Sequence, residues 1–169
     1  MAETLDGAIP ESIVRKAHLV LESADGKGMM LATAESCTGG LLAALLTDVP
    51  GLSHVFERGF VAYSKSAKCD LLDIDRDKVE GCGAVSREIA IDMAEGALRR
   101  SGAEVALSIT GFAGPGDEGD EEGLVHFACC RKGGAMTHRE EHFGSIGREG
   151  VRKAALEVAL DMMAGAVGE

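Results

Sequence analysis

The sequence predicts an α/β protein, a three-layer α/β/α sandwich around a mixed, mostly parallel sheet. Segments with helical periodicity alternate along the chain with short apolar runs that are typical of buried strands. Two later runs alternate apolar and polar residues on either side of a glycine pair, which is the pattern of an antiparallel hairpin. Polar clusters follow three of the predicted strands, and open α/β sheets bind ligands beyond the carboxyl ends of their strands.

The first quarter of the chain predicts two helices on either side of a strand. A broad apolar face predicts a helix over residues 10–23, and a buried strand follows at residues 29–34. The run 41–46 is apolar nearly all round and predicts a helix buried on most sides. We expect this helix to end near Asp48, because Pro50 cannot continue it.

The middle of the chain repeats this order. A β-prone run at residues 59–63 leads directly into a predicted helix over residues 64–72. Residues 73–83 are charged and flanked by glycine, which fits a short helix or a loop. A clear apolar stripe then predicts a helix over residues 87–100, with Ser86 as its N-cap.

The last third contains the hairpin. Residues 104–109 predict a buried strand, and residues 117–122 form an acidic, glycine-containing loop. The alternating runs 124–130 and 135–143 predict the two hairpin strands. Apolar residues at helical spacing predict a final helix over residues 148–164.

Length and charge limit the possible functions. The 169 residues fit one domain, 1–169, that is large enough to bury a core. Acidic residues outnumber basic ones by 28 to 17, and the net charge of −11 argues against a surface that coats nucleic acid. We find no basic leader followed by an apolar segment and no apolar run of membrane-spanning length. We therefore expect a soluble, cytoplasmic protein without nucleic-acid or membrane partners.

The cysteines and histidines do not predict a metal site. The five cysteines contain no C-x-x-C spacing, and no two histidines are spaced as metal ligands. We expect reduced cysteines that pack as small hydrophobic residues, with no metal and no other cofactor.

The first polar cluster lies in the sequence AESCTGG at residues 34–40. A strand, a turn and a helix N-terminus would leave backbone N–H groups near Ser36, Cys37 and Thr38 pointing outward. Such groups suit a bound phosphate or an oxyanion. A more ordinary interpretation is that Ser36 or Thr38 caps the helix while Gly39 and Gly40 allow the turn, and this stretch alone favours it.

The other two clusters add a possible base for Ser36. Tyr63 ends the second predicted strand, Lys68 lies one turn into the next helix, and Thr110 begins the glycine-rich turn TGFAGPG. No histidine lies beside any cluster, so a lysine whose pKa is lowered by burial is the candidate base. Tyr63 could orient Lys68 or relay a proton, and Cys37 is a rival nucleophile.

Five motifs, in order over nearly the whole chain, carry a family resemblance. These are AESCTGG (34–40), GFVAYSKSAK (59–68), GAVS (83–86), TGFAGP (110–115) and R-x-x-V-R (148–152). Together they resemble the CinA C-terminal domain family. The resemblance implies a nicotinamide-nucleotide amidase, which hydrolyses nicotinamide mononucleotide to nicotinic acid mononucleotide and ammonia without a metal.

The resemblance also implies roles for particular residues. It makes Ser36 the nucleophile, Lys68 the base and Tyr63 its partner. Backbone N–H groups near the first glycine pair would hold either the oxyanion or the nucleotide phosphate, a choice that the residues leave open. The candidate substrate-binding residues are Thr38, Gly39, Gly40, Thr110, Gly111, Gly114 and Arg148, and Arg148 suits a phosphate.

Two stretches depart from the family pattern. Residues 116–122 replace a longer loop with a Lys-Pro-Val element, and residues 143–147 carry one residue more than the usual Phe-x-Gly-x-Arg pattern. Both changes bear on substrate fit more than on the chemistry at Ser36. A non-catalytic nucleotide-binding or partner-interaction module is therefore the alternative function. The resemblance and the apolar Ala/Leu/Met helices also suggest a homodimer.

Overall fold

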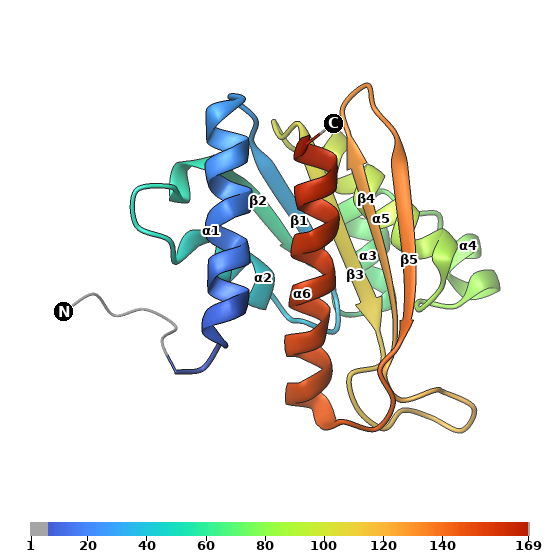
Figure 1. Ribbon diagram of the computed structural model, residues 1–169. Helices are drawn as coiled ribbons and strands as arrows, with labels where there is room; N and C mark the ends of the chain where they lie inside the picture. Colours follow the sequence, from blue (N-terminus) through green and yellow to red (C-terminus); the bar gives the residue numbers. More distant parts are fainter. Residues whose placement is uncertain (1–6, 169) are drawn as a thin grey trace.

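The computed structural model describes residues 7–168, which form a five-stranded sheet between two layers of helices (Figure 1). The strand order is β2-β1-β3-β4-β5. The strands are β1 (Leu31–Glu35), β2 (Phe56–Val61), β3 (Val105–Gly111), β4 (Leu124–Arg131) and β5 (Met136–His142). β1 is parallel to both β2 and β3, whereas β3, β4 and β5 pair antiparallel. The predicted α/β/α sandwich with a mixed sheet is confirmed. The expected single domain spans residues 1–169, of which 1–6 and 169 lie outside the described part.

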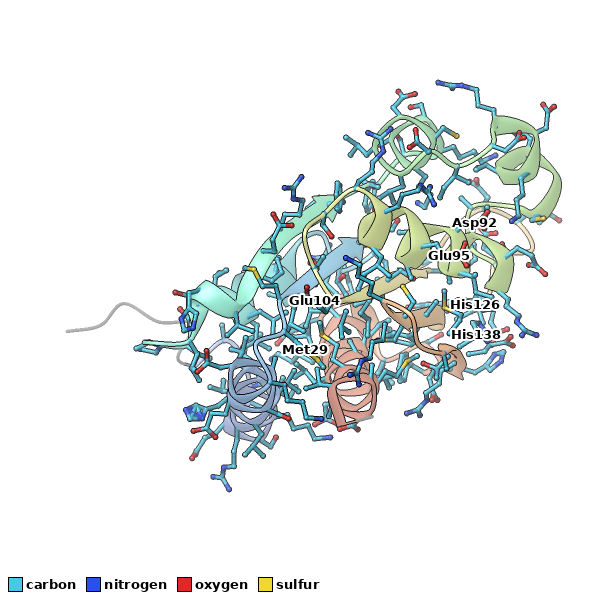
Figure 2. All side chains as sticks on the ribbon, turned by 90° about the horizontal axis from the view of Figure 1, so that it is seen from above. Met29, Asp92, Glu95, Glu104, His126 and His138 are labelled. Atoms are coloured by element: carbon cyan, nitrogen blue, oxygen red, sulfur yellow. The ribbon has the colours of Figure 1, made fainter. Side chains whose placement is uncertain are left out.

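The helices divide between the two faces of the sheet. One face carries α1 (Glu11–Gly26), α2 (Leu41–Thr47) and α6 (Gly147–Gly168). The other carries α3 (Lys65–Leu72), α4 (Arg76–Cys82) and α5 (Arg87–Arg99), and a short 3-10 helix, Ser53–Val55, precedes β2. Figure 2, seen from above, separates α1 and α6 on one side of the sheet from α5 on the other. Within residues 7–168, no helix has the length and apolar character needed to cross a membrane.

The two faces of the sheet differ in the size of their side chains. Large residues of β1, β3 and β4, such as Leu31, Leu107 and Phe127, pack against the α1 and α6 layer. Small residues of the same strands, such as Ala32 and Ala106, pack against the α5 layer. Because successive strand residues point to opposite faces, this alternation lets α5 approach the sheet closely while the other face builds the thicker core.

Several predicted boundaries need correction. The strand predicted at 59–63 is β2 at Phe56–Val61, so Tyr63 lies beyond it in the connection to α3. The segment 73–83, predicted as a short helix or a loop, contains α4, whose N-cap Asp75 accepts a hydrogen bond from the Asp77 amide at 2.8 Å. The last helix continues four residues past 164, because its buried residues continue to Val167.

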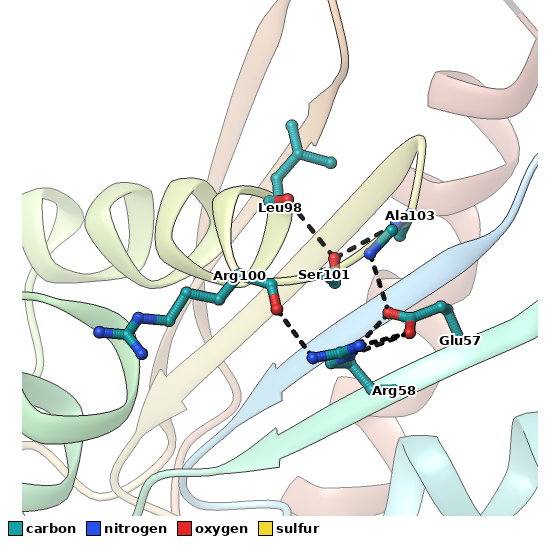
Figure 3. Close-up of polar contacts among 7 residues, drawn as sticks. Glu57, Arg58, Leu98, Arg100, Ser101 and Ala103 are labelled. Atoms are coloured by element: carbon teal, nitrogen blue, oxygen red, sulfur yellow. Dashed lines mark hydrogen bonds and ion pairs between the residues drawn. The ribbon is translucent and has the colours of Figure 1, made fainter.

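A polar network fixes the amino ends of the parallel strands. The Glu57 carboxylate accepts hydrogen bonds from Arg58 Nε at 2.8 Å and from the Gly102 amide at 3.1 Å (Figure 3). Arg58 also donates to the Arg100 carbonyl at 3.0 Å. The edge strand β2 is thereby tied to the connection between α5 and β3. The three polar clusters lie at the opposite edge of the sheet, at or beyond the carboxyl ends of β1, β2 and β3.

Candidate active site

The turn after β1 lies between the ends of the two neighbouring strands. The Ser36 amide donates to the Ile109 carbonyl of β3 at 2.9 Å, and the Ala62 amide after β2 donates to the Glu35 carbonyl at 2.9 Å. These bonds extend the parallel pairing by one residue on each side. They bring Ser36 to the same edge as Tyr63 and Thr110, as expected when parallel strands end together.

Ser36 and Lys68 are in direct contact. Lys68 Nζ, on the second turn of α3, lies 2.9 Å from Ser36 Oγ and donates to the carbonyls of Ala62 at 3.1 Å and Tyr63 at 3.4 Å. The Lys68 side chain is only 1% exposed. Burial lowers the pKa of Lys68 from its ordinary value of 10.5. No carboxylate of residues 7–168 forms an ion pair with it. The neutral form of this amine, which is the form that can accept a proton, is therefore easier to reach than in an exposed lysine.

Tyr63 approaches Lys68 through its backbone. Its carbonyl accepts the hydrogen bond from Lys68, whereas the residue as a whole is 63% exposed. The phenol has no hydrogen-bond partner within the described part of the chain. The catalytic role expected for the phenol stays a prediction.

Cys37 directly follows Ser36, and its thiol is buried. It is 4% exposed, and burial raises the pKa of its thiol to about 12. The positive charge of Lys68 acts in the opposite direction but does not offset burial. Since the thiolate is the reactive form, Cys37 is a poor nucleophile near neutral pH.

A buried carboxylate occupies the N-terminus of α2. Glu35, fully buried, accepts hydrogen bonds from the amides of Leu42 at 2.9 Å and Ala43 at 3.0 Å, and from Thr38 Oγ1 at 2.6 Å. This corrects the expectation that the N–H groups of this helix point outward without a partner. Sequence reasoning passed over Glu35, because it lies six residues before the first residue of α2, too far along the chain for an ordinary helix cap.

Two backbone amides of the turn are not used by the described part of the protein. The Gly39 amide donates to the Ser36 carbonyl at 3.0 Å. The amides of Thr38 and Gly40 have no acceptor within the described residues. Gly39 and Gly40 have φ of 60° and 96°, the left-handed region that favours glycine. The glycine pair therefore shapes a turn with two free donors next to Ser36.

The second glycine-rich turn is fixed by the protein itself. Thr110 Oγ1 donates to the Ala84 carbonyl at 2.8 Å, which places the GAVS segment beside the site. A Cβ on Gly111 would lie 2.6 Å from the Leu124 carbonyl oxygen, and one on Gly114 would lie 3.0 Å from Arg148 Nη2. Only glycine thus permits the close backbone contact at position 111, whereas at position 114 the Arg148 side chain would have to move aside. Direct contact of Thr110, Gly111 or Gly114 with a substrate stays a prediction.

A cationic cleft of about 480 Å³ adjoins the Ser36 turn. The α6 residues Arg148, Glu149, Arg152 and Lys153 line it together with Leu41, the first residue of α2. Glu149 forms an ion pair with Lys153, so the two arginines leave the lining with a positive charge. Arg152 Nε also donates to the Cys37 carbonyl at 2.9 Å. Arg152 was not predicted as a site residue. The R-x-x-V-R spacing contains the signal, because residues four apart share one helix face.

The acidic loop 116–122 projects from the same end of the molecule as the start of α6 (Figure 1). Backbone hydrogen bonds between Phe112 and Gly123 and between Phe112 and Leu124 close its base. An effect of the altered loop on substrate fit stays a prediction. Within residues 7–168, no group of three or more His, Cys, Asp or Glu side chains is arranged to hold a metal ion.

Known proteins match this chain over most of its length. The family model described as "CinA C-terminal domain" matches residues 14–167. The crystal structure of the competence/damage inducible protein CihA from Agrobacterium tumefaciens is 42% identical and superimposes with a TM-score of 0.91, covering 95% of this chain and 98% of that one. The competence damage-inducible protein A from Klebsiella pneumoniae is 30% identical with a TM-score of 0.87, covering 93% and 98%.

Curated relatives are longer proteins. A putative competence-damage inducible protein of Symbiobacterium thermophilum is 48% identical over 147 residues, which are 81% of this chain but 34% of that protein. A CinA-like protein of Chlorobium phaeobacteroides is 58% identical over 95 residues, 56% of this chain and 22% of that protein. The chain thus spans about a third or less of these two relatives. From the family match and the solved structures, the chain belongs to the CinA C-terminal domain family.

Proposed function

We propose that this protein is a nicotinamide-nucleotide amidase that hydrolyses nicotinamide mononucleotide to nicotinic acid mononucleotide and ammonia. The observation that carries the proposal is the 2.9 Å contact between Ser36 Oγ and the buried Lys68 amine. A serine needs a base to become a nucleophile, and a lysine with a lowered pKa can supply it. The family resemblance supplies the identity of the substrate.

The reaction proceeds through a serine ester. Ser36 Oγ attacks the carboxamide carbon while neutral Lys68 accepts the hydroxyl proton along their contact. The C–N bond then breaks, and Lys68 returns the proton to the leaving ammonia. Water, with its proton taken by Lys68, attacks the ester and releases the carboxylate product and Ser36. The open Thr38 and Gly40 amides are the proposed donors to the developing oxyanion.

The phosphate of the substrate is assigned to the cleft beside the turn. Arg148 and Arg152 line this cleft, and neither forms an ion pair with a carboxylate of the described residues. Arginine suits phosphate because its planar guanidinium donates two parallel hydrogen bonds. With Glu35 holding the N-terminus of α2, the cleft is a better phosphate site than that helix end.

Ammonia release from nicotinamide mononucleotide tests the proposal. Ser36→Ala and Lys68→Ala should each reduce turnover by at least about 1000-fold, as loss of paired nucleophile and base does elsewhere. Ser12→Ala and Lys65→Ala are matched controls, since Ser12 is exposed on α1 and Lys65 forms an exposed ion pair with Glu80 on the surface. No release by wild type, or full release by Ser36→Ala, would count against the amidase.

The alternative is a non-catalytic nucleotide-binding module, favoured by the cationic cleft and the altered loop 116–122. Calorimetry distinguishes the two functions. Tight binding of the mononucleotide by wild type without any ammonia release supports the binding module.

A further inference from the structure

Arg152 is the residue of α6 that contacts both the cationic cleft and the turn that carries Ser36. Its Nε donates to the Cys37 carbonyl at 2.9 Å, and Cys37 directly follows Ser36. Its Nη2 lies 3.7 Å from where a Cβ would stand on Gly39. The same guanidinium lines the cleft. One side chain therefore borders both the nucleophile turn and the space for a ligand.

The charge of Arg152 is left for a ligand. No carboxylate of residues 7–168 pairs with it, whereas its neighbour Lys153 pairs with Glu149 at 2.5 Å. A guanidinium carries five N–H donors in a planar fork, and the Cys37 carbonyl uses one. The remaining donors can bind an anion while Nε holds the backbone.

We propose that Arg152 is a positioning residue, through which an anionic group bound in the cleft holds the Ser36 turn in its reactive geometry. This role takes its substrate from the proposed amidase function, and it adds a task for Arg152 that the amidase proposal does not include. Binding energy from a remote group that is used to orient the reacting atoms appears in kcat, not only in KM. The phosphate of the mononucleotide should therefore accelerate the reaction itself.

Arg148 offers a matched comparison. It lies one helical turn before Arg152, lines the same cleft and packs against Gly114, but makes no hydrogen bond to the Ser36 turn. Loss of Arg148 removes a possible anion contact and leaves the Cys37 carbonyl bond in place. Loss of Arg152 removes both.

The first test compares nicotinamide mononucleotide with nicotinamide riboside, which lacks the phosphate. We expect Arg148→Gln to raise KM for the mononucleotide while kcat stays within about threefold. Arg152→Gln should lower kcat for the mononucleotide by about 10- to 100-fold and remove its advantage in kcat over the riboside. Arg152→Lys should share this loss, because lysine keeps the charge but lacks the fork. An Arg152→Gln variant that raises KM with unchanged kcat overturns the proposal.

A second test does not depend on the carboxamide substrate. A fluorophosphonate labels a reactive serine, with Ser36 Oγ displacing fluoride, and its labelling rate is measured with and without inorganic phosphate. We expect phosphate to speed labelling of wild type but not of Arg152→Gln or Arg152→Lys, with thermal unfolding confirming that at least one variant is folded. Equal rates under all these conditions overturn the positioning role. If phosphate speeds labelling as expected but wild type releases no ammonia from the mononucleotide, the positioning role of Arg152 stands and the amidase is rejected.

Discussion

Lys68 and Lys65 lie three residues apart on α3 in opposite surroundings. The Lys65 amine forms an exposed ion pair with Glu80 at 3.3 Å, while the Lys68 amine is buried among three oxygens that carry no charge. Burial without a carboxylate favours the neutral amine. The sequence pointed to Lys68 through its place after a predicted strand. It could not show that the backbone of Ala62 and Tyr63 would be its other partners.

The lowered pKa of Lys68 predicts the direction of the pH dependence of ammonia release. In the proposed mechanism the neutral amine is the base, so kcat/KM should rise with pH through a limb whose apparent pKa lies below the ordinary lysine value of 10.5. A pH–rate profile of wild type measures it, and Lys65→Ala should reproduce the same limb. A limb at or above the ordinary value contradicts a buried lysine base.

Cys37→Ala should retain activity within about threefold, because the replaced thiol is protonated at neutral pH. Ammonia release measures this directly, with Ser36→Ala as the inactive comparison. Iodoacetamide labelling gives a second readout, in which the exposed Cys82 should react well before the buried Cys37. A loss of activity as large as that of Ser36→Ala would instead favour a thiol nucleophile.

At the level of helices and strands, periodicity predicted the types well and the ends less well. The buried strands β1 and β3 shifted by only one or two residues, because their apolar runs are continuous. β2 shifted more, since it is an edge strand that is half exposed and therefore has a weaker pattern. The N-terminus of α2 was misjudged for another reason, because its Glu35 cap lies seven residues before Leu42.

Glu35→Gln should destabilise the protein by about 1–3 kcal/mol, because both carboxyl oxygens accept hydrogen bonds and the NH₂ group of glutamine cannot replace one of these acceptors. Urea unfolding measures the loss. We expect kcat to fall as well, since the turn between Glu35 and α2 carries Ser36. Glu57→Gln is the matched control, because its carboxylate also ties backbone and side chains together but at the opposite end of the sheet. It should leave kcat unchanged.

Gly96→Ala tests the close packing of α5 against α3. The added Cβ would collide with the Leu72 carbonyl oxygen and lie 2.9 Å from Leu72 Cβ. We expect a loss of about 1–3 kcal/mol from overpacking, although alanine is the better helix former. Gly165→Ala in α6 is the control, since nothing lies within 4 Å of its added Cβ. Thermal unfolding of both variants measures the difference. Equal stability of Gly96→Ala and Gly165→Ala would contradict the tight contact at Gly96.

For the molecule as a whole, alternation of helices and strands predicted the layers and the shared carboxyl edge of the sheet. It did not predict the cationic cleft, because residues 7–9, α2 and α6 are far apart in sequence and meet only through packing. Nor did it predict that Arg152 would reach the Cys37 carbonyl. The homodimer suggested by the resemblance stays a prediction.

Two histidines of the β4–β5 hairpin should make the stability of the protein depend on pH. His126 Nδ1 lies 3.1 Å from His138 Nε2, and Figure 2 shows the two side chains close together. Burial lowers the pKa of both from 6.5. The two histidines therefore bind protons more readily in the unfolded chain than in the folded protein. Their contribution to the free energy of unfolding is complete above pH 6.5 and is lost as pH falls through their lowered pKa values in the folded protein. Glu88 and Glu140 oppose the shift of both residues, and Arg87 adds to that of His138.

Thermal unfolding over a range of pH measures this loss. The double variant His126→Gln/His138→Gln should lose less stability on acidification than wild type. His142 remains in the variant and acts in the opposite sense, since Glu121 and Glu140 raise its pKa and its stabilisation is lost as pH rises. An NMR titration of His126 should give a pKa below 6.5. An unshifted value would contradict the effect of burial.

The Lys68 amine and the cationic cleft should also differ in how they respond to ionic strength. Dissolved ions screen attraction between exposed charges over about 10 Å at 0.1 M ionic strength. Lys68 Nζ contacts a hydroxyl and two carbonyls, and within residues 7–168 it forms no ion pair that dissolved ions could screen. At Arg148 and Arg152 the opposite holds, because their charges face an open cleft. We therefore expect added potassium chloride to raise KM for the proposed anionic substrate and to leave the pKa of Lys68 unchanged.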